Sequence, residues 1–171
     1  KAAHPEFTCY AESRDGLVWT KPKLGLFEFN GSKDNNIVWT GDGTHCFTPF
    51  RDANPACAPE TRYKALSRSG RQGMHAYQSA DGVRWSLLTP ELVITDGDFD
   101  SQNLAFWDPR RECYVEYHRK VKNRVRDIMT STSTDFIHWT KPEYLDYGDA
   151  PAEHLYTNAI QPYLRAPHLL I

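Results

Sequence analysis

The sequence has neither an excess of charge of one sign nor a long apolar run. It contains 20 Lys and Arg against 22 Asp and Glu, a formal net charge of -2. Binding to a phosphate backbone depends on a basic excess, so the composition argues against a nucleic acid partner. Mean hydropathy is -0.64, and no apolar stretch approaches the roughly 20 residues that a membrane helix needs. We therefore expect no membrane span.

Several motifs of cofactor, metal and nucleophile chemistry are also missing from the sequence. There is no Gly-x-Ser-x-Gly elbow, no Walker loop and no Rossmann fingerprint, which leaves serine hydrolase, NTPase and dinucleotide chemistry without support. The 7 His show no His-x-x-x-His pair, and the 4 Cys show no Cys-x-x-Cys pair. We therefore expect no metal site and no cofactor. Two readings of the cysteines stay open: Cys46 pairs with Cys57 across a short loop, or all four are thiols.

Helical periodicity is weak along the whole chain, whereas turn formers and aromatic residues are frequent. The 171 residues include 11 Pro and 10 Gly, and 13% are aromatic. This mixture is typical of short strands joined by many turns. The length alone favours one globular domain.

One heptapeptide pattern, Ser-x-Asp-[Gly/Phe]-[aliphatic]-x-Trp, occurs three times. The copies are Ser13–Trp19, Ser79–Trp85 and Ser133–Trp139, and they start 66 and 54 residues apart. With 9 Ser, 13 Asp and 5 Trp in the chain, chance would give about 0.02 copies of Ser-x-Asp-x-x-x-Trp. The pattern therefore marks a repeated structural unit.

Each copy has the chemistry of a hairpin turn. An Asp can accept hydrogen bonds from backbone N–H groups that follow it, and a Gly accepts positive φ. Strand-like runs precede the copies at 7–11, 74–78 and 128–132. We predict that each copy clamps a hairpin, and that Trp19, Trp85 and Trp139 enter the core.

Further strand-like runs fill the intervals between the copies. They lie at 36–39, 46–50, 62–66, 104–107 and 113–119, and a run at 156–160 starts a further unit. We predict an all-β protein of radial blades, with blade boundaries near residues 30, 96 and 150. The spacing makes the chain about three blades long. The start at Lys1 and the end in an apolar run also indicate that the chain is a piece of a longer protein. We expect this piece to be inactive by itself, because a truncated propeller has an incomplete site.

The repeat resembles the five-bladed β-propeller glycoside hydrolases, the superfamily of invertases, levansucrases and arabinanases (families 32, 68 and 43). The runs 62–65, 100–103, 106–108, 114–119, 156–158 and 165–168 further resemble a bacterial group described as invertase-like. Sialidase Asp boxes have one more residue between Asp and Trp, so this chain departs from them. The resemblance covers most of the chain.

The resemblance implies a funnel at the propeller axis, where inner strands present acidic residues to a sugar. Cleavage of a glycosidic bond needs two carboxyl groups, one as acid and one as nucleophile or base. The acids that precede inner strands in this chain are Asp98 or Asp100, Glu153 and Asp34. Within the acidic run 96–100 we expect Asp96 and Asp98 to form the turn, which leaves Asp100 as the catalytic candidate. Alternatively, Asp100 belongs to a solvated acidic turn, Glu153 to a surface loop and Asp34 to an Asn-rich turn.

Polar and aromatic residues near these acids are candidates for sugar binding. A guanidinium holds a carboxylated or sulfated sugar by paired hydrogen bonds, and an indole ring stacks on a sugar face. The alternative is a structural role, in salt links between blades for the charged groups and in blade cores for the Trp residues. The candidates are Asn36, Trp39, Asn103, Trp107, His118, Arg119, His154, Tyr156 and Asn158.

The resemblance thus implies a glycoside hydrolase-like protein whose partner is a carbohydrate substrate. A glycoside phosphorylase and a non-catalytic carbohydrate- or protein-binding propeller remain open alternatives, because a fold does not fix activity. A leader peptide would lie upstream of Lys1, so the sequence leaves the compartment open. The family resemblance implies an extracytoplasmic location.

Overall fold

The structure, a computed structural model, describes residues 4–100 and 102–171 and is all-β. It consists of several antiparallel sheets, none of which closes on itself. The one helical turn among the described residues is the 3₁₀ turn η1 (Pro59–Thr61). The all-β fold class predicted from the turn formers and the weak helical periodicity is confirmed.

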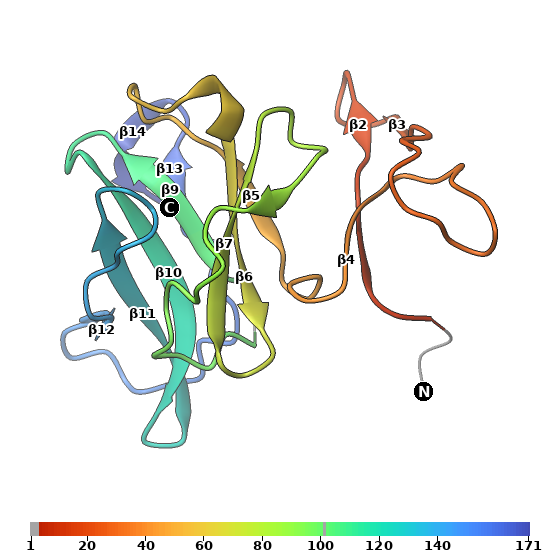
Figure 1. The fold of residues 1–171 in the computed structure, drawn as a ribbon. Coiled ribbons are helices and arrows are strands. Elements are labelled where there is room, and N and C mark those ends of the chain that lie inside the picture. The colour runs from red at the N-terminus through yellow and green to blue at the C-terminus, as the bar shows by residue number, and fades with distance from the viewer. Residues whose placement is uncertain (1–3, 101) are drawn as a thin grey trace.

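Two four-stranded sheets follow each other along the chain (Figure 1). In each sheet every strand pairs with its sequence neighbour, so both are antiparallel meanders. The first consists of β5 (Thr48–Arg51), β6 (Tyr63–Ser69), β7 (Gly73–Ser79) and β8 (Ser86–Leu87). The second consists of β9 (Leu104–Asp108), β10 (Cys113–Lys122), β11 (Val125–Ser133) and β12 (Glu143–Tyr144).

Three smaller sheets of two strands complete the fold. They pair β1 (Phe7–Cys9) with β4 (Ile37–Thr40), β2 (Glu12–Ser13) with β3 (Trp19–Thr20), and β13 (Pro162–Tyr163) with β14 (Ala166–Leu170). The run at 36–39, predicted as an inner strand of the blade that follows it, pairs instead with β1. Gly41 and Gly43 have positive φ and turn the chain before β5 begins. The run at 156–160 forms no strand.

The three heptapeptide copies form the same hairpin turn. In each copy the Ser Oγ donates to Asp Oδ1 at 3.0 Å. The same Asp oxygen accepts two backbone N–H groups at 2.7–2.9 Å. The Trp Nε1 donates to the carbonyl oxygen three residues earlier. The copies connect β2 to β3, β7 to β8 and β11 to β12, so the predicted hairpin clamp is confirmed.

The main hydrophobic core lies between the two four-stranded sheets. Leu66 and Met74 from the first sheet meet Ala105 and Tyr114 from the second, and Phe136 from the third turn joins them. A second cluster covers the other face of the second sheet. Strand β10 is consequently buried on both faces from Tyr114 to Arg119.

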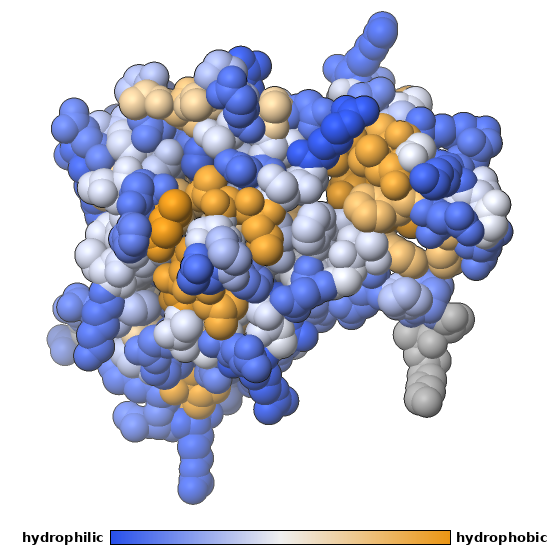
Figure 2. All heavy atoms as spheres, in the orientation of Figure 1, coloured by the Kyte–Doolittle hydropathy of each residue, from blue (hydrophilic) through white to orange (hydrophobic). Residues whose placement is uncertain are grey.

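The three repeat tryptophans do not share one environment. Trp139 packs against the main core, and Trp85 is half-buried against Phe47 at a ring distance of 5.0 Å. Trp19 is 60% exposed, so its predicted core position is wrong. It belongs to the two-stranded sheet β2–β3, in an N-terminal region where Figure 2 shows a hydrophobic area at the surface. All four cysteines are free thiols, so Cys46 and Cys57 are not paired.

Candidate functional site

A cavity of about 620 Å³ opens at the end of the two sheets where the β6–β7 and β10–β11 turns project (Figure 1). The connections that lead into β5 and β9 reach this same end, because neighbouring strands run antiparallel. The charged residues that line the cavity are Asp98, Asp100, Arg68, Arg71, Arg119, Arg124 and Arg126. The lining therefore has a net charge of +3 with His154 neutral, in a chain whose overall charge is -2.

Asp100 lies between two arginines from different sheets. Its Oδ2 accepts a hydrogen bond from Arg119 Nη2 at 3.0 Å, and its Oδ1 lies 3.3 Å from Arg68 Nη1. His45 Nε2 is 4.0 Å from the same Oδ1. The Asp100 side chain is 58% exposed, while that of Arg119 is only 5% exposed. A buried guanidinium thus holds a carboxylate that solvent and a ligand can reach.

The loop 96–100 is tied to β10 at several points. The Asp98 N–H donates to the Arg119 carbonyl oxygen at 2.9 Å. Asp98 Oδ2 accepts the Val121 N–H at 2.6 Å, and Asp96 forms an ion pair with Lys120. The carboxylates of Asp96 and Asp98 therefore fix the loop, as expected for turn formers, while Asp100 is held at the cavity.

A buried pair, Glu116 and His118, supports this loop from below. His118 Nε2 must donate to the Asp96 carbonyl oxygen at 2.9 Å, because that oxygen only accepts. His118 Nδ1 lies 2.8 Å from Glu116 Oε2, and Glu116 Oε1 accepts the Ser131 hydroxyl at 2.5 Å. Both side chains are fully buried. His118, predicted to touch the sugar, is instead placed beneath the loop and not among the residues that line the cavity.

The other two predicted carboxylates lie away from Asp100's cavity. Glu153 lines a separate hollow of about 460 Å³, together with Asp127 and Tyr147. Asp34 forms an exposed ion pair with Lys23 at 2.5 Å. The structure therefore does not bring the three predicted acids into one cavity.

Two of the predicted binding residues line the cavity, and a third packs beside them. Arg119 and His154 line it, and the centroid of the Tyr156 ring lies 5.3 and 5.1 Å from the guanidinium carbons of Arg119 and Arg126. The backbone N–H of Arg126 donates to His154 Nδ1 at 3.1 Å. A neutral His154 therefore has its proton on Nε2.

The remaining predicted binding residues make structural contacts. Asn36 Nδ2 donates to the Tyr10 carbonyl at 2.5 Å, Trp39 Nε1 donates to Asp42 O at 2.6 Å, and Trp107 packs on the core.

Two predicted asparagines, Asn103 and Asn158, are buried close to the loop 96–100. They donate to the carbonyl oxygens of Phe99 and Gln102, respectively. Their Oδ1 atoms have no hydrogen-bond partner in the part of the chain that the structure describes.

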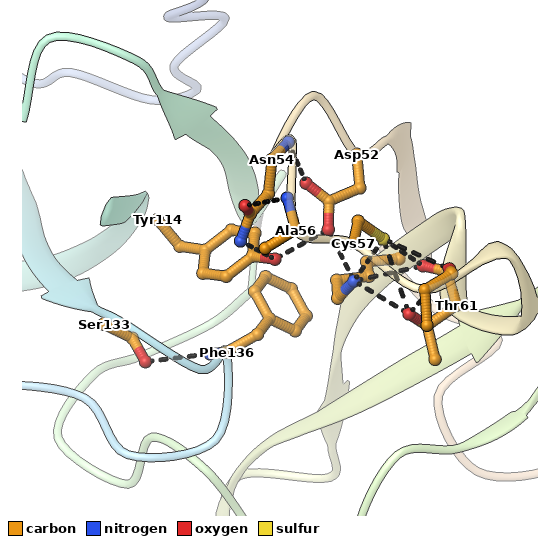
Figure 3. Close-up of polar contacts among 10 residues, drawn as sticks. Asp52, Asn54, Ala56, Cys57, Thr61, Tyr114, Ser133 and Phe136 are labelled. Carbon is orange, nitrogen blue, oxygen red and sulfur yellow. Dashed lines mark hydrogen bonds and ion pairs between the residues drawn. The ribbon is translucent and has the colours of Figure 1, made fainter. Parts of the chain in front are cut away.

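A second buried polar cluster joins the two sheets and was missed in the sequence (Figure 3). Lys64 Nζ lies 2.5 Å from Asp52 Oδ2, and these side chains are 5% and 0% exposed. The Tyr114 hydroxyl donates to the same oxygen at 2.7 Å. Burial raises the pKa of Tyr114, and the hydrogen bond to Asp52 raises it further. The signal in the sequence was a lysine within the apolar run 63–66, and Glu116 within 113–119 gives the same signal.

The described residues contain neither a clustered metal site nor a membrane-spanning helix. No group of three or more His, Cys, Asp or Glu side chains within 4–100 and 102–171 is placed to hold a metal ion. No helix in those ranges is long and apolar enough to cross a membrane.

Comparison with known protein families and with curated proteins finds no match for this chain.

Proposed function

We propose that this chain forms blades of a β-propeller of the glycoside hydrolase type and that its cavity binds a carbohydrate. The two consecutive four-stranded meanders support this architecture, because each has the strand order of a propeller blade. Their facing sides pack on a common core, as neighbouring blades do. The matching turn between third and fourth strands in both sheets supports the same reading.

The observation that carries the function is the gathering of Asp100, Arg119 and His154 at one cavity. These residues come from three separate segments, and the sequence predicts each of them as a catalytic or binding residue. Asp100 acts as the nucleophile or base, since its ion pairs with Arg119 and Arg68 hold its carboxylate at the cavity. A second carboxyl group must supply the proton to the leaving oxygen. Glu153 is the leading candidate in this chain, because its neighbour His154 lines the Asp100 cavity.

The experiment is a screen of aryl glycosides and polysaccharides with the protein in its complete natural form, followed by variants. Asp100→Asn should lower kcat/KM at least about 100-fold, the effect of losing a positioned base or nucleophile. Asp149→Asn, an exposed carboxylate away from the cavity, is the matched control. Full activity of Asp100→Asn would refute its role, and full activity of Glu153→Gln would assign the acid elsewhere.

A second function, carbohydrate binding without cleavage, is favoured by one observation: Asp100 and Glu153 line different hollows. Paired catalytic carboxyl groups are about 5–9.5 Å apart. If the natural protein binds a glycan on an array but releases no sugar from it, and Arg119→Gln abolishes that binding, this second function holds.

A further inference from the structure

We infer that the cavity contains an oxyanion subsite, which accepts a phosphate, sulfate or carboxylate group on its arginines. The inference rests on the proposed function, because it concerns the ligand of the same cavity. Five guanidinium groups line it against two carboxylates. A neutral sugar requires no such excess of positive charge.

The two carboxylates do not use all of this charge. Asp98 is bonded to the backbone of Val121, and Asp100 is held by Arg119 and Arg68. Arg71 and Arg124 make no hydrogen bond or ion pair with the described residues. Arg71 belongs to the turn between β6 and β7, and Arg124 to the turn between β10 and β11. Two guanidinium groups on different sheets are therefore available at one cavity.

Arg119 is the buried arginine of the cavity wall. Its side chain is 95% buried, being only 5% exposed, and its Nε has no hydrogen-bond partner within the described residues. Its Nη groups are bonded to Asp100 and to the Tyr156 carbonyl oxygen. This Nε is enclosed by protein, so the subsite depends on the exposed arginines Arg71 and Arg124.

The chemistry of the lining favours an oxyanion over any other charged ligand. A planar guanidinium presents paired N–H donors that match the oxygens of phosphate, sulfate and carboxylate groups. The Tyr156 ring packs on the guanidinium groups of Arg119 and Arg126, so the oxyanion would bind chiefly to Arg71 and Arg124. The oxyanion has two possible sources: free inorganic phosphate as a co-substrate, or an acidic substituent on the sugar.

The test measures binding to the natural protein by titration calorimetry, with inorganic phosphate, sodium sulfate, glucuronic acid and neutral glucose as probes. At least one oxyanion should bind, and binding should weaken at least tenfold in Arg71→Gln/Arg124→Gln. The control Arg165→Gln removes one exposed arginine from the β13–β14 turn, outside the cavity, and should bind as the natural protein does.

The outcomes separate the two sources from each other. Tight phosphate binding together with phosphate-dependent release of sugar assigns a co-substrate. Glucuronate binding at least tenfold tighter than both glucose and phosphate assigns a substituent of the sugar. Either result supports the subsite.

The inference fails if none of the probes binds, or if the double variant binds like the Arg165→Gln control. Its failure is distinct from failure of the proposed function. Cleavage of neutral glycans without oxyanion binding would overturn the subsite alone, whereas oxyanion binding without any glycan turnover or binding would overturn the proposed function alone.

Discussion

Phe136 occupies a backbone position that the other two hairpin turns give to glycine. Its φ is 67°, close to the 75° and 76° of Gly16 and Gly82. A bulky residue is rarely found in this region because its Cβ crowds the backbone. The ring of Phe136 is fully buried in the core between the sheets. Burial of the ring thus offsets the strain of the backbone.

The first prediction compares these two contributions at Phe136. Phe136→Gly should relieve about 1 kcal/mol of strain but lose about 3–5 kcal/mol of ring burial, so the free energy of unfolding should fall by about 2–4 kcal/mol. Gly82→Ala is the reference for strain, because its new Cβ would meet only ordinary contacts near 3.5 Å. It should cost about 1 kcal/mol. Urea denaturation measures both, and a Phe136→Gly variant as stable as the parent would contradict the account.

The turn carboxylates should also make stability depend on pH. Partial burial acts to raise the pKa of Asp81, but hydrogen bonds from the Arg84 and Val83 N–H groups outweigh it and lower the pKa to about 2. The unfolded value is about 3.9, so the folded state binds this proton less readily. The contribution of Asp81 is therefore complete above about pH 4 and is lost as pH falls through about 2.

Asp81→Asn tests this dependence, because the amide keeps an acceptor oxygen but does not titrate. Between pH 4 and pH 2 the free energy of unfolding should fall less steeply for the variant than for the parent protein. Urea denaturation at a series of pH values gives the two slopes. Equal slopes would contradict the role of the Asp81 carboxylate.

At the scale of elements, the loop 96–100 depends on a close approach between Gly97 and β10. A Cβ on Gly97 would lie 2.5 Å from His118 Cδ2 and 2.6 Å from His118 Nε2. The same Cβ would lie 2.5 Å from Phe99 Cε1. The His118 ring cannot move freely, because it is hydrogen-bonded on both nitrogens and packs on the Phe99 ring at 5.0 Å. The loop that presents Asp100 can therefore take this position only with glycine at 97.

Gly97→Ala should accordingly displace the loop and cost about 1–3 kcal/mol, as overpacking does in other cores. Glycan binding or turnover should decrease along with stability. Gly148→Ala is the control, since nothing lies within 4 Å of its added Cβ and only its positive φ costs energy. Thermal denaturation and the glycan assay measure the two effects, and unchanged binding by Gly97→Ala would separate the loop from the site.

Local sequence patterns predicted the strands but not their partners. The predicted runs at 74–78, 113–119 and 128–132 lie in β7, β10 and β11. The turn that joins β9 to β10 is closed by a hydrogen bond from the Arg110 N–H to Asp108 Oδ1. These signals depend on alternation and turn chemistry within a few residues. Pairing is a long-range property, which is why the run at 36–39 was assigned to the wrong sheet.

The sequence singled out only some of the residues that line the cavity, for the same reason. Asp100 and Arg119 stand out locally, one in an acidic turn and one at the end of a buried strand. Arg68, Arg71, Arg124 and Arg126 do not stand out, since exposed arginines are common along any chain. They gather at one cavity only because two hairpin turns project from the same end of two packed sheets.

For the whole molecule, the Asp52 cluster adds buried polar contacts to the hydrophobic interface between the two sheets. Asp52 follows β5, Lys64 lies on β6 and Tyr114 lies on β10, so the cluster crosses the interface. Removing one partner of a buried ion pair leaves an uncompensated charge, which typically costs about 3–5 kcal/mol.

Lys64→Met should therefore lower the free energy of unfolding by about 3–5 kcal/mol. The double variant Lys64→Met/Asp52→Asn should recover part of that loss, because Asn is neutral and still accepts the Tyr114 hydroxyl. Denaturant titrations of both variants give the comparison. A double variant less stable than Lys64→Met alone would mean that the charge of Asp52 is stabilised by groups other than Lys64.

The central proposal is that a sugar binds at Asp100. It is supported by the two packed sheets, by the same type of turn in each sheet and by the arginine-lined cavity. A crystal structure of the natural protein bearing Asp100→Asn, soaked with the glycan identified in the screen, tests it directly. We predict a sugar ring in the cavity, with a hydroxyl or ring oxygen within hydrogen-bond distance of the residue 100 side chain. A glycan bound at another face, with the cavity holding only solvent, would contradict the claim.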